Sequence, residues 1–377
     1  MIGFNGVYRR AIVGAFALIL CSLIPNITYA FKLKPSGTDD EQVIVNLEGG
    51  IPSLFWSKVT RLLMDHFTNG VHEEVTNRIW GCSLPQGADV RDARCLLWKD
   101  TPDAVLYGVQ WNDNPPFKLD ASGDKNCALS TPIRLPDRQP NCWRILFGDA
   151  AKRAAAGEYL MQRGGFSLLY RSHFGDLQFL HAMASWNGEA MNATRSKIMM
   201  WAEFSYRVAV GDIKPSTRMS EVSIPGFRNV LGQYWSDVTL LFTYGVPAYQ
   251  GRIPEVAFGS LLHLVQDSFS KSHVSREPAV GICGGDEKKP NGGRIIEFHG
   301  YGDQDGDKHG VQDSRDIMLA SLISDPKNNV VTVGRHLKSL YDRREPWSVV
   351  KDYLEACVFS VAEDDMEKPA GPGQFSR

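Results

Sequence analysis

The sequence lacks an excess of charge of either sign, because 41 Lys and Arg residues balance 43 Asp and Glu residues and leave a net charge of −2. Dedicated nucleic-acid-binding proteins usually carry a basic excess, so this class is disfavoured, although an enzyme that cuts nucleic acid is not. The chain also lacks an internal repeat and the C-x2-C spacing of a zinc knuckle. What remains is an ordinary globular composition with 43% hydrophobic residues.

Residues 1–30 have the features of an export signal. Arg9 and Arg10 precede the apolar run AIVGAFALILCSLIP, and small residues offer a cleavage site at Ala30. The apolar run is shorter than the roughly 20 residues of a spanning helix, so we expect export without a transmembrane helix in the mature chain. A twin-arginine signal and lipidation of Cys21 are alternatives, but a general secretory signal fits better. We expect a secreted or periplasmic protein.

Six cysteines remain beyond this segment, and an even number in an exported chain predicts disulfides. Six cysteines allow 15 connectivities, and their order along the chain favours Cys82–Cys95, Cys127–Cys142 and Cys283–Cys357. Residues 82–145 contain four of them, are rich in proline and turn signals, and show little amphipathic pattern. We expect this segment to be a loop-rich, disulfide-pinned insertion with short strands around AVLYGVQW.

Helical periodicity covers most of the remaining chain, beginning near Pro52 and continuing through HEEVTNRIW, ATRSKIMMWAEFSYRVAVG and DSRDIMLASLI. No second composition marks another large domain. The sequence therefore predicts a mainly α fold: one multi-helix domain over residues 31–366, with the insertion at about 82–145. Residues 367–377, with the sequence EKPAGPGQFSR, are expected to form a disordered tail.

Histidine is scarce and unevenly placed. Eight of the nine histidines form four close pairs along the chain: His66 and His72, His173 and His181, His263 and His273, His299 and His309. Random placement would rarely set so many of them beside aspartates on expected helices. His66 and His173 favour structural roles, and the others are candidate ligands.

The clearest pattern is H-x3-D-x5-H, formed by His263, Asp267 and His273. Four residues make one helical turn, so His263 and Asp267 project from the same helix face. Apolar neighbours predict that this helix lies in the core, and His273 stands near the point where Pro278 must end it. A buried imidazole and carboxylate one turn apart form either a satisfied polar pair or two ligands of a metal.

Similar pairs recur elsewhere. Asp176 and His181 are five residues apart, and His309 and Asp313 stand at i and i+4, as do His299 and Asp303. Imidazole and carboxylate groups without thiolate suit zinc in an open hydrolytic site. The total is too large for one tetrahedral ion, so we expect two or three Zn²⁺ ions that share carboxylates.

Taken in order, these motifs resemble those of the zinc-dependent bacterial phospholipases C, which share their fold with the fungal single-strand-specific zinc nucleases. The similarity covers residues 170–325 and 56–80. It is carried by HEEVTNRI from His72, by HFGD followed by His181 and AEFSY, by the H-x3-D-x5-H pattern, and by HGVQD from His309.

The resemblance implies eight metal ligands: His72, Asp176, His181, His263, Asp267, His273, His309 and Asp313. Asp176 would also bridge two ions or orient the attacking water as general base. In the family, the amino group of an N-terminal tryptophan completes the third site. Here cleavage would expose Phe31, Trp56 would need a second cleavage, and His66 might substitute, so the third site stays open. His299 with Asp303 remains an alternative to the last pair.

The resemblance further implies a phospholipase C that cleaves phospholipids at a membrane surface into diacylglycerol and a phosphorylated head group. Phosphatidylcholine is the first candidate, and no stable nucleic-acid partner is expected. Two alternatives remain: a single-strand nuclease that uses the same metals, and an exported binding protein that keeps the fold without catalysis. Head-group preference and oligomeric state do not follow from the sequence.

Overall fold

The protein is represented by a computed structural model, which describes residues 70–84, 92–119, 127–135, 138–232, 236–244, 246–281, 283 and 289–377. The expected export signal at residues 1–30, the expected helix from Pro52, and the residues Trp56 and His66 lie outside this part of the chain. Within it, no helix is both long enough and apolar enough to cross a membrane.

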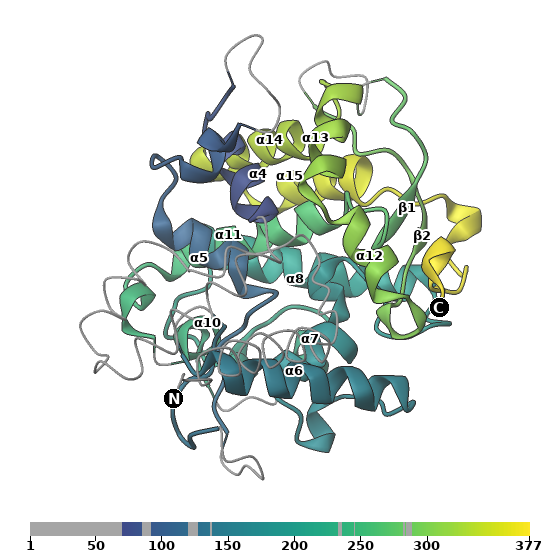
Figure 1. The fold of residues 1–377 in the computed structure, drawn as a ribbon. Coiled ribbons are helices and arrows are strands. Elements are labelled where there is room, and N and C mark those ends of the chain that lie inside the picture. Colours follow the sequence, from purple (N-terminus) through teal and green to yellow (C-terminus); the bar gives the residue numbers. More distant parts are fainter. Residues whose placement is uncertain are drawn as a thin grey trace, which may run out of the picture.

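The described residues are mainly α-helical, as the sequence predicts (Figure 1). Their α-helices are α4 (Val71–Ile79), α5 (Asp103–Trp111), α6 (Pro140–Ala155), α7 (Leu168–Phe174), α8 (Met191–Val210), α9 (Phe227–Val230), α10 (Val238–Thr243), α11 (Ile253–Asp267), α12 (Gly306–Gln312), α13 (Arg315–Ser324), α14 (Val330–Asp342) and α15 (Trp347–Tyr353). A two-stranded antiparallel sheet pairs β1 (Val274–Arg276) with β2 (Ile295–Phe298).

Helix α11 lies at the centre of the molecule, between α5 and α8 (Figure 1). Of its fifteen residues, Pro254 and Glu255 are the two that are not buried. Proline suits the first turn, because the amide hydrogens there have no partner inside the helix. A helix that is apolar on all sides is stable when other elements surround it. The polar side chains of α11 are therefore held inside the core.

Helix α5 corrects the expectation for residues 82–145. The segment AVLYGVQW forms a buried helix against α11, and the Tyr107 hydroxyl donates a hydrogen bond to the carbonyl oxygen of Phe242 at 2.8 Å. An apolar run of eight residues fits a buried strand and a buried helix equally well by periodicity. Packing against α11 decides for the helix, so the prediction of short strands is wrong.

Two glycines let α5 and α11 approach closely. A Cβ atom on Gly108 would lie 2.1 Å from the carbonyl oxygen of Val256, and a Cβ atom on Gly259 would lie 2.2 Å from that of Val105. Both obstacles are backbone atoms, which cannot move aside as the end of a side chain could. The contact therefore sets the separation of the two helices.

We expect Gly259→Ala to lower the free energy of unfolding by about 1–3 kcal/mol or more, because the added methyl group overpacks this contact. Chemical denaturation of the purified protein measures the effect. Gly148→Ala on α6 is the matched control, since a Cβ atom there meets nothing within 4 Å, and it should stabilise a helix interior by up to about 1 kcal/mol. Equal stability of the two variants would contradict the close-contact argument.

Helices α6 and α7 form a second, smaller core beside the main one. Its buried side chains include Trp143 and Phe147 from α6 and Leu169 from α7. The rings of Trp143 and Phe147 stack at a centroid distance of 5.1 Å. Because α6 begins inside the segment expected to be an insertion, that segment contributes to a packed layer and not to loops alone.

The three disulfides join the pairs that the order of the cysteines favours: Cys82–Cys95, Cys127–Cys142 and Cys283–Cys357. The prediction is confirmed. Three disulfides in one chain are typical of a protein that resides in an oxidising compartment.

The C-terminal residues pack against the body of the protein, which corrects the expectation of a disordered tail at 367–377. Phe375 is 4% exposed, and its carbonyl oxygen accepts a hydrogen bond from the Asp305 amide at 2.7 Å. Ala370 exchanges backbone hydrogen bonds with the segment of Gly188 and Glu189. These long-range contacts order a segment whose composition alone suggests disorder.

Candidate metal centre

Helix α11 carries His263 and Asp267 on one face, as the spacing predicts, and ends at Asp267. It does not continue to Pro278, because the chain turns at Ser268, whose hydroxyl donates to the carbonyl oxygen of Val265 at 2.7 Å. His273 therefore lies in a loop that leads into β1. That loop directs His273 away from the helix and towards a second group of side chains.

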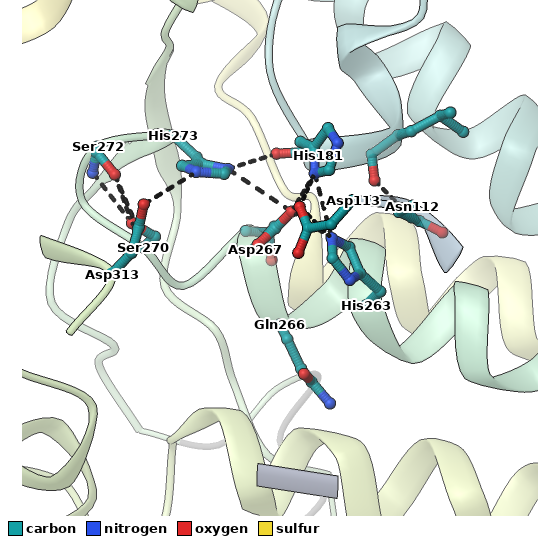
Figure 2. A network of polar contacts seen from close by, with 12 residues as sticks. Asn112, Asp113, His181, His263, Gln266, Asp267, Ser270, Ser272, His273 and Asp313 are labelled. Atoms are coloured by element: carbon teal, nitrogen blue, oxygen red, sulfur yellow. Dashed lines mark hydrogen bonds and ion pairs between the residues drawn. The ribbon is translucent and has the colours of Figure 1, made fainter. Parts of the chain in front are cut away.

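The Asp267 carboxylate is surrounded by three histidines from different parts of the chain. Its Oδ2 atom lies 2.8 Å from His181 Nδ1 and 2.9 Å from His263 Nε2. Its Oδ1 atom lies 3.3 Å from Nε2 of His72, on α4. All four side chains are buried. Figure 2 shows Asp267, His181 and His263 directed towards one another.

A second group joins His273, His309 and Asp313. The Asp313 Oδ2 atom lies 2.9 Å from His309 Nε2 and 3.7 Å from His273 Nε2. Its Oδ1 atom accepts hydrogen bonds from the hydroxyls of Ser270 and Ser272, which hold the carboxylate in place (Figure 2). The last expected pair is thus brought beside His273.

The alternative pair does not enter this group. His299 is buried, but its Nδ1 lies 3.0 Å from the Ser272 carbonyl oxygen and its Nε2 lies 2.9 Å from the Ser275 hydroxyl. Both ring nitrogens are therefore occupied by ordinary hydrogen bonds. Asp303 accepts a hydrogen bond from the amide of Asn187.

Asp176, the expected bridging ligand and general base, lies apart from both groups. Its two oxygens accept hydrogen bonds from the Arg171 guanidinium at 2.7 and 2.8 Å. A bidentate ion pair of this kind uses one lone pair on each oxygen and neutralises the charge that would attract a metal. The arrangement gives Asp176 a structural role.

Asp113 stands in the position that the sequence assigned to Asp176. It is fully buried, and its Oδ1 atom lies 3.5 Å from His181 Nδ1 and 3.8 Å from His263 Nε2. Its Oδ2 atom lies 3.8 Å from His72 Nε2. Figure 2 shows its carboxylate next to that of Asp267.

Two asparagines fix the turn that carries Asp113. The Asn112 amide donates to the Leu180 carbonyl oxygen at 2.7 Å, and its oxygen accepts from the Ser260 hydroxyl at 2.6 Å. The Asn114 oxygen accepts from the Leu135 amide at 3.0 Å. In the sequence, Asn112-Asp113-Asn114 is an ordinary turn signal. The available clue was its position directly after an apolar segment that could be a core helix.

Four of the histidines are oriented in the same way. Nδ1 of His72 lies 2.6 Å from Gln266 Oε1, and Nδ1 of His309 lies 2.6 Å from Gln304 Oε1. Nδ1 of His263 and of His273 approaches a backbone carbonyl oxygen at 2.6 and 2.7 Å. These oxygens are placed to accept the Nδ1 proton, and Nε2 then faces an aspartate in each case, which is the usual support of a metal-binding histidine.

The donor set fits a metal cluster. Side chains whose ligand atoms lie within 4.8 Å of one another include three groups: His72, Asp113 and His263; His181, His263 and Asp267; and His273, His309 and Asp313. Among the described residues, both oxygens of Asp113, Oδ1 of Asp267 and Oδ2 of Asp313 have no hydrogen-bond partner. Buried carboxylates without hydrogen bonds are costly unless they are paired or coordinate a metal. Cations would satisfy these atoms.

Without a cation, the groups perturb one another. Burial raises the pKa of Asp113 well above its usual range, and the nearby carboxylates of Asp267 and Asp313 add to this effect. Burial lowers the pKa of His263 to about 3. Burial also opposes protonation of His273, but Asp267 and Asp313 outweigh it and raise the pKa of His273 to about 9.

Metal binding at pH 8 should therefore release a proton from His273. A pKa of about 9 means that the metal-free ring is protonated at this pH, and a metal binds only the neutral ring. The release should diminish as the pH rises through 9. Calorimetric titration with Zn²⁺ in two buffers of different ionisation enthalpy measures it. Identical heats in both buffers at pH 8 would refute this assignment.

A small pocket with a cavity volume of about 20 Å³ lies beside the cluster and is partly open to solvent. It is lined by Phe147, Ser172, His173, Gln178, His181, Met183, His273, Tyr301 and His309. None of these residues is an Asp, Glu, Lys or Arg. The pocket therefore gives access to the histidines along mainly apolar and aromatic walls.

Comparison with protein-family models, with curated proteins and with solved structures finds no match for this chain. The assignment of this centre thus depends on its own geometry.

Proposed function

We propose that this protein is a zinc-dependent phosphodiesterase of the phospholipase C type, which acts on phospholipids at a membrane surface. Phosphatidylcholine is the first candidate substrate, cleaved to diacylglycerol and a phosphorylated head group. One observation carries the proposal: three buried aspartates, with lone pairs that accept no hydrogen bond, lie among histidines that each direct a ring nitrogen at them, Nδ1 in His181 and Nε2 in His72, His263, His273 and His309. Imidazole and carboxylate without thiolate favour zinc in a hydrolytic site.

The proposed ligands are His72, Asp113, His181, His263, Asp267, His273, His309 and Asp313. A bound pair or triplet of divalent cations supplies Lewis acidity, which lowers the pKa of water and neutralises charge on phosphoryl oxygens. Asp113 replaces Asp176 as the residue that orients water for attack on phosphorus, because its buried oxygens accept no hydrogen bond. Asp176 is committed to Arg171.

The pocket supports an apolar substrate. Its walls include Phe147, Met183 and Tyr301, whose apolar surface would lie against a lipid substrate. Gln178 is engaged within the wall, since its Oε1 atom accepts from the Tyr301 amide at 3.1 Å and its Nε2 atom donates to the Ser185 carbonyl oxygen at 3.1 Å. Export from the cytoplasm belongs to the same proposal, and the disulfides support it.

A single-strand nuclease is the second candidate. Aromatic side chains in the pocket wall can stack on a nucleobase, and the last ligand, Asp313, is an aspartate, which favours the nucleases within the resemblance. Both candidates need the same metals, so the substrate distinguishes them.

The test is hydrolysis of phosphatidylcholine vesicles and of single-stranded DNA by the purified protein, before and after chelation. Lipid cleavage that chelation removes and Zn²⁺ restores is the expected result. Cleavage of DNA without lipid cleavage would select the nuclease. Bound metal without either activity would leave an exported binding protein.

A further inference from the structure

One histidine beside the cluster is not among the ligands that the motifs suggest. His173 lies in α7 and is buried. Its ring meets that of Phe147 edge to face at 5.0 Å and that of Trp143 at 6.5 Å. The small core of α6 and α7 therefore fixes the plane of the imidazole. His173, for which the sequence favours a structural role, is therefore held in one orientation next to the centre.

The hydrogen bonds of His173 define its tautomer. Nδ1 lies 3.0 Å from the carbonyl oxygen of Leu169, one turn earlier in the same helix. The Ser172 hydroxyl, which can donate or accept, also lies 3.0 Å from Nδ1. A carbonyl oxygen only accepts hydrogen bonds, so the contact with Leu169 favours the tautomer in which Nδ1 carries the proton and Nε2 holds a lone pair. His263 and His273 are arranged in the same way, each with Nδ1 against a backbone carbonyl oxygen.

The Nε2 atom of His173 is buried and has no hydrogen-bond partner among the described residues. His173 forms a fourth group with Asp113 and His181, in which each residue offers one ligand atom and these atoms lie within 4.8 Å of one another. Asp113 thereby belongs to two groups, this one and that of His72 and His263. Asp113 and His173, each with a buried atom that lacks a hydrogen bond, thus belong to the same group.

We infer that His173 supplies an additional nitrogen ligand to the metal centre, together with Asp113 and His181. This inference rests on the metal centre of the proposed function, but not on the substrate. It adds a ninth ligand to the eight proposed above. The small core of α6 and α7 begins in the cysteine-rich segment. Through His173 on α7 it would supply a ligand to the centre.

The test is metal binding by the full chain, with His173→Gln compared with the matched control His299→Gln. His299 is also buried and close to the centre, but both of its nitrogens have hydrogen bonds inside the protein. Metal-free protein is titrated with Zn²⁺ against a chromophoric chelator. We expect His173→Gln to weaken one equivalent of Zn²⁺ at least about 10-fold, while His299→Gln binds as the wild type.

X-ray absorption of the zinc-loaded protein provides a readout that a packing role would not change. The average number of nitrogen ligands per zinc should fall in His173→Gln and stay constant in His299→Gln. If His173→Gln does not fold, His173→Ala with added imidazole replaces it, and imidazole should restore the lost affinity. Unchanged affinity and nitrogen number in a folded His173 variant would overturn the inference. Failure to cleave any phosphodiester would instead refute the proposed function.

Discussion

Replacing Asp113 with asparagine should abolish phosphodiester hydrolysis and lower metal affinity by at least about 100-fold, more than the loss of a residue that only supports a ligand. Asp113 is fully buried and belongs to two of the candidate groups, and an amide cannot supply its negative charge. Metal analysis of the purified protein and kcat/KM measure the two effects. Asp176→Asn is the control, because Asp176 contacts Arg171 and not the centre. It should keep its full metal content.

In the metal-free protein the effect of the same substitution should reverse. Burial and the carboxylates of Asp267 and Asp313 raise the pKa of Asp113 above the ordinary value of 3.8. A raised folded-state pKa means that the stability contributed by the neutral carboxyl is present below pH 3.8 and is lost as the pH rises through the raised pKa. Metal-free Asp113→Asn should therefore melt above the metal-free wild type at pH 7.

This advantage should shrink as the pH falls towards 4, where the wild-type carboxyl becomes protonated as well. Thermal unfolding of both proteins in the presence of a chelator follows the comparison. A metal-free Asp113→Asn variant that melts below the wild type at pH 7 would show that the carboxylate stabilises the fold without a cation, contrary to the argument for a metal site.

Removal of the metals by a chelator should lower the Tm of the wild type by about 10 °C or more, since one site at a thousandfold excess of metal over Kd contributes about 4 kcal/mol. The metal-free protein keeps three aspartates in a fully buried cluster. Their mutual repulsion is the physical source of the loss. Differential scanning calorimetry before and after chelation measures the shift.

Added Zn²⁺ should restore the Tm, whereas Mg²⁺ should not, because histidine nitrogens suit zinc and magnesium prefers oxygen ligands. Chelator that has been saturated with Zn²⁺ is the control for direct effects on the protein. An unchanged Tm after verified loss of all metal would contradict a centre that stabilises the fold.

Much of the centre follows from local spacing. His263 and Asp267 share a helix face because four residues make one turn, and His309 with Asp313 repeats this geometry one turn apart. The structure brings these residues together with His72, His181 and His273. The order of the cysteines likewise anticipated the disulfides, since two of the three loops that they close are short, with separations of 13 and 15 residues.

Which of the two carboxylates, Asp113 or Asp176, lies beside the histidines depends on tertiary contacts that no periodic pattern in the sequence reveals. Asp176 follows a histidine motif in the chain, but Arg171, five residues earlier, occupies both of its oxygens. Asp113 lies in a turn that asparagine side chains tie to segments far away in the chain. Sequence proximity to a motif therefore pointed to a carboxylate that the fold pairs with an arginine.

The sequence by itself determined the helical class, the two disulfides that close short loops and the histidine–aspartate pairs that share a helical turn, because each depends on short-range spacing. Only the tertiary structure decided that the cysteine-rich segment supplies a core helix, Asp113 and the walls around His173. These features depend on the close contact of α5 with α11. Gly108 and Gly259 permit that contact because they have no Cβ atom. That contact joins residues about 150 positions apart, as in the bond from His263 to the Val109 carbonyl oxygen, 154 residues away.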